Sequence, residues 1–272
     1  MGLQVVETAI VVFDIDGVVR DVSGSYRRAL ADTVEQFTQG AYRPSQEDID
    51  DLKTEGCWNN DWEASQEMIY RYFEAEGRSR QSIQSDPTTT FTYEELVAFF
   101  QSRYRGTDPI HWNGYICQEP LLMEAAYLDS LTQAGIRWGF FSGATRGSAN
   151  YVLEKRLGLQ TPVLVAMEDA PGKPDPTGLQ KTVAQLQAGT APRSPVIYVG
   201  DTVADMFTAK HARDHYPDRT WLGVGVIPPH AQTNAEQRDT YATTLRQAGA
   251  EIVLDNVQQL TPKTISQLLG SV

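Results

Sequence analysis

The chain has few cysteines, no long apolar run and a shortage of basic residues. Cys57 and Cys117 lie far apart in the sequence and match no zinc or redox spacing, which favours free thiols over a disulfide. No apolar stretch approaches the ~20 residues of a membrane helix, and the N-terminus has no basic region followed by an apolar one. We therefore expect a cytoplasmic protein with no membrane partner.

The charge balance also argues against polyanionic partners. The chain has 35 acidic and 23 basic residues, a formal net charge of −12, so neither nucleic acid nor an anionic membrane is an expected partner. A small anionic substrate remains compatible, because a metal and a few well-placed cations reverse the sign locally. The length of 272 residues fits one large domain, or a core with an insert, in a monomer or a homodimer.

The stretch at residues 10–19 organises the rest of the chain. An apolar run rich in β-branched residues ends at Asp14 and Asp16, and Gly17 follows. Such a run is typical of a buried strand in a parallel sheet, and open α/β sheets bind ligands at the carboxyl ends of their strands. Two neighbouring carboxylates at that place repel each other unless a cation or a lysine compensates them. The stretch thus predicts a metal and a lysine partner; the alternative is an acidic turn.

Two kinds of pattern follow along the chain. Residues 25–104 predict helices without a convincing strand, and residues 78–90 are rich in Ser, Gln and Thr, which is typical of an exposed loop. From residue 120 onward, apolar runs alternate with helical patterns, which predicts a doubly wound parallel sheet. We therefore expect an α/β core domain at residues 1–20 and 115–272, with an α-helical domain inserted at residues 21–114.

Three further strand ends carry polar groups. Ser142 and Gly143 precede a predicted helix, as in an anion site, although such turns are common without a function. Lys173 lies in a segment stiffened by prolines, which is either a site or a rigid surface loop. Asp201 and Asp205 are four residues apart at a helix start. The helix dipole explains either acid singly, but Mg²⁺ explains the two together.

Four segments, taken in order, resemble the motifs of the haloacid dehalogenase-like (HAD) hydrolase superfamily: DIDGVV, the strand ending in Ser142, Gly-Lys-Pro and GDTVAD. The resemblance is to the phosphatase type, with a helical cap inserted after the first motif. It implies that Asp14 is the nucleophile and that Asp16 is the general acid and base. It further implies that Ser142, the N–H of Gly143 and Lys173 bind the phosphoryl group. The metal site that it implies is formed by Asp14, the Asp16 carbonyl and Asp201, with Asp205 either as a further ligand or as a residue that contacts a ligand.

The function that this resemblance implies is a Mg²⁺-dependent phosphatase. It would hydrolyse a small phosphorylated metabolite through an aspartyl-phosphate intermediate. Asp16 disfavours a dehalogenase, because a halide leaves without a proton whereas an alkoxide needs one. The alternatives are a phosphomutase or phosphotransferase with the same residues, a phosphoaspartate switch and a binding module.

The insert is similar to the caps of phosphoglycolate phosphatases and β-phosphoglucomutases, in which a loop between the first helices selects the substrate. Lys53, Trp58, Asn59 and Asn60 occupy that place, although Trp58 alternatively packs within the cap. Arg20 stands where relatives often have an apolar residue. It either contacts a substrate anion or is an exposed hinge residue.

Overall fold

The computed structural model describes residues 9–58, 60–187 and 193–270. It divides the chain into two compact units. The sheet unit comprises Met1–Asp21 and Leu121–Val272, and the helical unit comprises Val22–Pro120. The helical unit is an insert between the first and second strands of the sheet.

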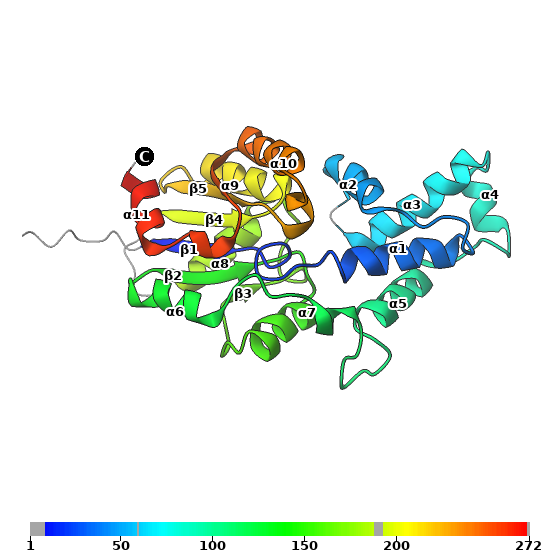
Figure 1. The fold of residues 1–272 in the computed structure, drawn as a ribbon, viewed down its shortest axis with the longest axis horizontal. Helices are drawn as coiled ribbons and strands as arrows, with labels where there is room; N and C mark the ends of the chain where they lie inside the picture. The colour runs from blue at the N-terminus through cyan, green and yellow to red at the C-terminus, as the bar shows by residue number, and fades with distance from the viewer. Residues whose placement is uncertain (1–8, 59, 188–192, 271–272) are drawn as a thin grey trace, which may run out of the picture. The chain divides into compact units, whose positions relative to one another are not determined.

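In the described residues, six parallel strands form one sheet in the order β3-β2-β1-β4-β5-β6 (Figure 1). The strands are β1 (Ile10–Phe13), β2 (Arg137–Phe141), β3 (Leu164–Val165), β4 (Val196–Gly200), β5 (Trp221–Val226) and β6 (Ala250–Leu254). The chain winds outward from β1 in one direction and from β4 in the other, so the winding reverses between these two strands. Open α/β sheets bind their ligands at such a switch point. The predicted doubly wound parallel sheet is confirmed.

Helices cover both faces of the sheet. They are α6 (Ala125–Gln133), α7 (Arg146–Asn150), α8 (Thr177–Leu186), α9 (Val203–His215), α10 (Ala235–Ala248) and α11 (Pro262–Gly270), with a π-helical turn at Tyr151–Arg156 and 3₁₀ turns at Pro229–Gln232 and Val257–Gln259. None of the helices in the described residues has both the length and the apolar composition needed to cross a membrane.

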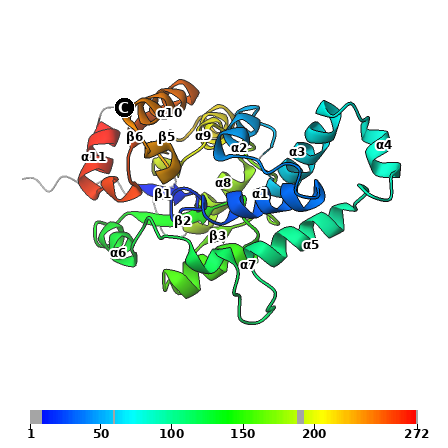
Figure 2. The same ribbon diagram turned by 45° about the vertical axis from the view of Figure 1, so that its right-hand side comes forward.

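The apolar run of β1 is explained by its burial on both faces. Ile10 and Val12 belong to a core cluster that also contains residues of α8 and α9. Phe13 points to the opposite face, where its ring lies 6.1 Å from that of Phe140 and 6.2 Å from that of Tyr127 on α6. Figure 2 shows the sheet and these helices from a second direction. A strand covered on both sides has no polar face, so its sequence does not alternate.

The helical unit has its own apolar core. It consists of α1 (Tyr26–Phe37), α2 (Gln46–Thr54), α3 (Asp61–Ala75), α4 (Arg80–Ser85), α5 (Tyr93–Tyr104) and a 3₁₀ turn at Tyr115–Gln118. Helix α1 packs against α3 and α5 and buries Leu30, while the rings of Tyr26 and Tyr104 stack with their centroids 4.0 Å apart. Cys57 and Cys117 belong to this unit and are not joined by a disulfide.

The prediction of a loop throughout residues 78–90 is wrong, because α4 lies within this segment. The Ser79 hydroxyl accepts a hydrogen bond from the Ser82 N–H (3.2 Å) and so caps the helix. Ile83 is completely buried and attaches the helix to its unit. A single apolar residue among Ser, Gln and Thr gives too weak a periodic signal for a helix to be predicted.

Candidate active site

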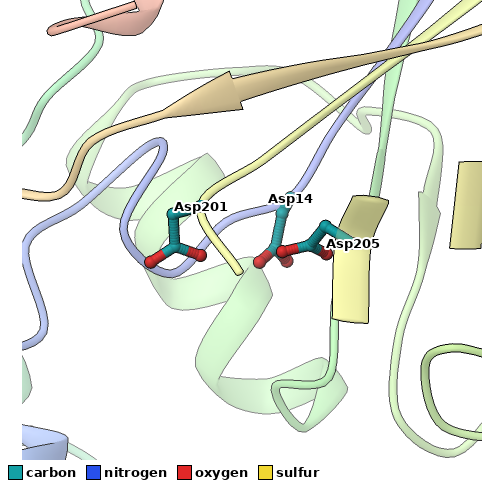
Figure 3. Close-up of side chains that lie close together, drawn as sticks. All are labelled: Asp14, Asp201 and Asp205. Atoms are coloured by element: carbon teal, nitrogen blue, oxygen red, sulfur yellow. The ribbon is translucent and has the colours of Figure 1, made fainter. Parts of the chain in front are cut away.

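Three buried aspartates meet at the switch point between β1 and β4 (Figure 3). Asp14 directly follows β1, Asp201 follows β4, and Asp205 lies in the first turn of α9. One carboxylate oxygen of each lies within 4.8 Å of the other two. The strand pairing brings them together: Phe13 is in register with Val199, and the Asp14 N–H donates a hydrogen bond to the Val199 carbonyl (2.8 Å).

Two glycines make room for these carboxylates. Gly17 has a φ of +74°, which residues with a Cβ rarely adopt, and a Cβ at this position would overlap the Asp201 carboxylate. A Cβ at Gly200 would overlap the Asp205 side chain. The glycines in both motifs therefore allow acids from separate segments to approach one another closely.

Lys173 joins two of the acids. Its Nζ lies 2.8 Å from Oδ1 of Asp14 and 2.7 Å from Oδ1 of Asp205, and only 10% of its side chain is exposed. The ammonium group also lies over the rings of Phe141 and Tyr198. Burial alone would lower the pKa of Lys173, but the charges of Asp14 and Asp205 outweigh it and raise the pKa. Lys173 is thus a fixed positive charge beside Asp14.

Asp205 is held by protein donors at both carboxylate oxygens. Oδ1 accepts from Lys173 and from the Tyr198 hydroxyl (2.9 Å), and Oδ2 accepts from the N–H (3.0 Å) and hydroxyl (2.6 Å) of Thr202 in a capping box. Burial acts to raise the pKa of Asp205, but Lys173 and the hydrogen bonds hold it below the usual value. Asp205 therefore orients Lys173 and the start of α9.

Asp201 has a different environment from Asp205. In the described parts of the chain, no group donates a hydrogen bond to its carboxylate, although the residue is only 9% exposed. Burial, together with the charges of Asp205 and Asp14, raises the pKa of Asp201 well above its usual range. Burial also raises the pKa of Asp14 to about 7, against the opposing charge of Lys173. Burial is the main cause of both shifts, and the charges of the neighbouring aspartates add to it.

A divalent cation fits this donor set. When all three carboxylates are ionised, Lys173 neutralises one charge and leaves a formal charge of −2 on the cluster. Carboxylate oxygens are the ligands that Mg²⁺ prefers. Asp14 and Asp201 are the residues best suited to bind it, since Asp205 already accepts hydrogen bonds at both oxygens.

Asp16 is paired with Arg20, which is completely buried. Nε and Nη2 of Arg20 lie 2.7 and 2.6 Å from Oδ1 of Asp16. The alternative of Arg20 as an exposed hinge residue is therefore wrong. A charged side chain is usually exposed, and no local pattern indicated that a partner four residues away would allow burial.

Ser142 and Gly143 follow β2 at the same edge of the sheet as Asp14, because Phe13 is in register with Phe140. Ser142 is buried, and its Oγ accepts a hydrogen bond from the Ala144 N–H (3.1 Å). Gly143 is exposed. This turn therefore presents an accessible backbone beside a fixed hydroxyl.

The predicted specificity residues belong to the helical unit. Nζ of Lys53 lies 2.7 Å from Oδ1 of Asp61, and Nε1 of Trp58 donates to Oε2 of Glu55 (2.8 Å). Asn60 caps α3 by accepting a hydrogen bond from the Trp62 N–H (3.0 Å). These contacts give each of the three side chains a local partner in its own unit. Asn59 lies outside the described residues.

Two tyrosines at the acid cluster were not predicted from the sequence. Tyr198 holds Asp205, and the Tyr241 hydroxyl, from α10, donates to the backbone carbonyl of Asp201 (3.0 Å). A hydroxyl within the otherwise apolar strand β4 was a signal for Tyr198. Tyr241 gave no signal, since only the packing of α10 brings it to Asp201.

The sequence matches a family profile of haloacid dehalogenase-like hydrolases over residues 8–213. Among curated proteins, it is 28% identical over 246 residues to an imidazoleglycerol-phosphate dehydratase of Phytophthora nicotianae. That alignment covers 89% of this chain and 49% of the relative, so the chain spans about half of the relative's length.

Solved structures with the same fold include phosphatase Tt82 from Thermococcus thioreducens, with a TM-score of 0.61 and 22% identity over 86% of this chain and 99% of that one. A phosphonoacetaldehyde hydrolase-like protein from Oleispira antarctica has a TM-score of 0.65 and 19% identity, covering 97% of this chain and 94% of the other. At these identities, the likeness concerns the fold alone.

Proposed function

The chain belongs to the haloacid dehalogenase-like hydrolases, and we propose that it is a Mg²⁺-dependent phosphatase acting on a phosphate monoester of a small molecule. The observation that carries the proposal is the buried cluster in which Lys173 joins Asp14 to Asp205, while the Asp201 carboxylate accepts no hydrogen bond from any described residue. We further propose that residues 21–114 form its cap domain and that residues 1–20 and 115–272 form its core.

In the first step, a carboxylate oxygen of Asp14 attacks phosphorus. The bond between phosphorus and the ester oxygen breaks, Asp16 gives its proton to that oxygen, and the alcohol leaves. Lys173 balances the negative charge on Asp14 and the phosphoryl group, while Ser142 and the Gly143 N–H bind phosphoryl oxygens. Mg²⁺ supplies Lewis-acid stabilisation of the phosphoryl charge when bound.

In the second step, water attacks the phosphorus of the aspartyl-phosphate. Asp16, now a carboxylate, takes a proton from the water as the bond from phosphorus to Asp14 breaks. Inorganic phosphate leaves, and both aspartates return to their starting states. A single acid thus acts in both directions, so its position relative to Asp14 governs both steps.

The test is phosphate release from a panel of phosphate monoesters, with Mg²⁺ or with EDTA. The panel contains p-nitrophenyl phosphate, sugar and polyol phosphates and imidazoleglycerol phosphate, the last because one relative's name includes it. We expect Mg²⁺-dependent release that Asp14→Asn reduces by at least about 10⁴-fold, because the nucleophile is lost. Asp214→Asn is the matched control, since this residue lies exposed on α9.

Four results would contradict the proposal. Release that survives in Asp14→Asn excludes Asp14 as the nucleophile, and release that is unaffected by EDTA excludes the metal. An isomeric phosphate ester as product, instead of inorganic phosphate, identifies a phosphomutase. A phosphoryl group that remains on Asp14 after mixing with substrate, without turnover, identifies a switch.

A further inference from the structure

Arg20 combines complete burial with contact to one carboxylate oxygen. Its exposed fraction is 0%, and both Nε and Nη2 approach Oδ1 of Asp16. Removing a guanidinium from water is expensive unless its partner is well placed. The Asp16 carboxylate is one partner that compensates the burial of this guanidinium.

The contact orients the Asp16 carboxylate. An arginine frequently binds a carboxylate through two parallel hydrogen bonds, one to each oxygen. Here both nitrogens converge on Oδ1, at 2.7 and 2.6 Å, and the Asp16 side chain remains 30% exposed. Rotation about the Cβ–Cγ bond would break both contacts. Oδ2 is consequently the oxygen presented for proton transfer.

The backbone fixes Arg20 in the same turn. The Gly17 N–H donates to the Arg20 carbonyl (2.9 Å), and Arg20 forms β-bridges with Asp16 and with Leu121. Its side chain and its main chain are therefore both attached to the loop that follows Asp14. Its contact with Asp16 links it to the residue that the proposed mechanism uses as acid and base.

We propose that Arg20 is a positioning residue that holds Asp16 so that Oδ2 delivers the proton to the leaving oxygen. The inference rests on the proposed function. It differs from the expectation that Arg20 binds a substrate anion, since Nε and Nη2 of the guanidinium already lie against Oδ1 of Asp16.

The experiment compares kcat/KM for phenyl phosphate and p-nitrophenyl phosphate, which share a ring but differ in how much the leaving oxygen needs a proton. This parameter reports the steps up to the release of the phenol. For Arg20→Met, we expect kcat/KM to fall about 10–100-fold with phenyl phosphate, because a misplaced acid loses much of its effect, and less than about 3-fold with p-nitrophenyl phosphate. Arg20→Lys should restore part of the loss.

A double-mutant cycle tests whether Arg20 acts through Asp16. In an Asp16→Asn background, Arg20→Met should have no further effect on the ratio between the two substrates, because the acid is already absent. If Arg20→Met does not fold, Arg20→Lys is measured in both backgrounds instead. Thermal unfolding of each variant shows which of them are folded.

Equal losses with both substrates, or a loss that persists in the Asp16→Asn background, would overturn the role of Arg20 and leave the phosphatase proposal standing. A wild-type protein without Mg²⁺-dependent phosphate release would instead contradict the proposed function itself. The two failures are therefore distinguishable.

Discussion

Two groups of charged residues, one in each unit, differ in how their carboxylates are compensated. In the helical unit, Glu67 is paired with Arg71 (2.8 Å) and Arg80 (3.0 Å). These arginines also pair with Glu55 (2.6 Å) and Glu74 (2.8 Å), so each glutamate has a guanidinium partner. The arginines are 42% and 47% exposed, which keeps them hydrated.

In the sheet unit, three buried aspartates share one ammonium group, and Asp201 receives no donor from the described residues. Both groups contain three acids, but each acid of the first has a guanidinium partner, whereas Asp201 in the second has no donor from the described residues. The three glutamates with two arginines carry a formal charge of −1, and the three ionised aspartates with Lys173 carry −2. A paired, partly exposed network stays hydrated and adds only modestly to stability. A buried cluster with an unpaired charge is costly unless a cation or a proton compensates it. The difference separates a structural network from a site.

The largest expected effect comes from removing the Lys173 ammonium group from the buried cluster. Lys173→Met should lower the free energy of unfolding by about 3–5 kcal/mol, because it leaves buried carboxylates without a partner. Added Mg²⁺ should raise the melting temperature more in the variant than in the wild type. Lys210→Met, at an exposed position of α9, is the control. An unchanged melting temperature in Lys173→Met without Mg²⁺ would show that the cluster is not short of positive charge.

The second prediction concerns the carbonyl of Asp201. Tyr241→Phe removes the hydrogen bond that holds it, which is worth about 1 kcal/mol, and should weaken Mg²⁺ binding about 5-fold. Calorimetric titration of Mg²⁺ into the protein without substrate measures this directly. Thr244→Ala changes an exposed residue of the same helix and should leave the affinity unchanged. An identical Mg²⁺ isotherm for Tyr241→Phe would mean that α10 does not support the metal site.

The third prediction concerns the pH dependence of the paired network in the helical unit. Although burial acts in the opposite direction, hydrogen bonds from Arg80 and Arg71 hold the pKa of Glu67 below its ordinary value of 4.5. The stabilisation by Glu67 is therefore present above that value and is lost as the pH falls through the pKa in the folded state. Glu67→Gln should lower the free energy of unfolding by about 1 kcal/mol at pH 7 and flatten its acid dependence.

The effect of Glu67→Gln on the free energy of unfolding should be the same with Mg²⁺ and with EDTA, unlike the effects of changes at the aspartate cluster. Glu63→Gln alters an exposed residue of the same helix and serves as the control. A Mg²⁺-dependent difference between Glu67→Gln and the wild type would remove the distinction between the two groups.

The smallest effect is expected at Asn60. Asn60→Ala removes the cap of α3 and should destabilise the protein by about 1 kcal/mol, whereas Asn60→Asp keeps a capping oxygen and should be nearly neutral. Denaturant unfolding measures both. The prediction that Asn60 selects substrate adds a second readout. A substrate preference that changes in Asn60→Asp as well would support a role in substrate selection. An unchanged preference in both variants would leave Asn60 with only its role in capping helix α3.

Local sequence patterns were sufficient to predict much of the fold and to predict which residues form the acid cluster. The apolar run before Asp14 indicated a strand buried on both faces, and the acid after β4 indicated a second strand end at the same edge. Strands that alternate with helices in sequence leave few arrangements, so carboxyl ends of neighbouring strands meet. The helix α4 was missed because its signal rests on Ile83 alone.

The sequence by itself determined which residue types stand at the strand ends, because strand burial and glycine turns are local properties. Only the tertiary structure decided how they are compensated: Arg20 turns inward to Asp16, Lys173 joins Asp14 to Asp205, and Tyr241 reaches Asp201 from 40 residues away. Hydrophobic periodicity specifies which face of an element is buried. It does not specify which polar group meets which inside, since that depends on strand order and register.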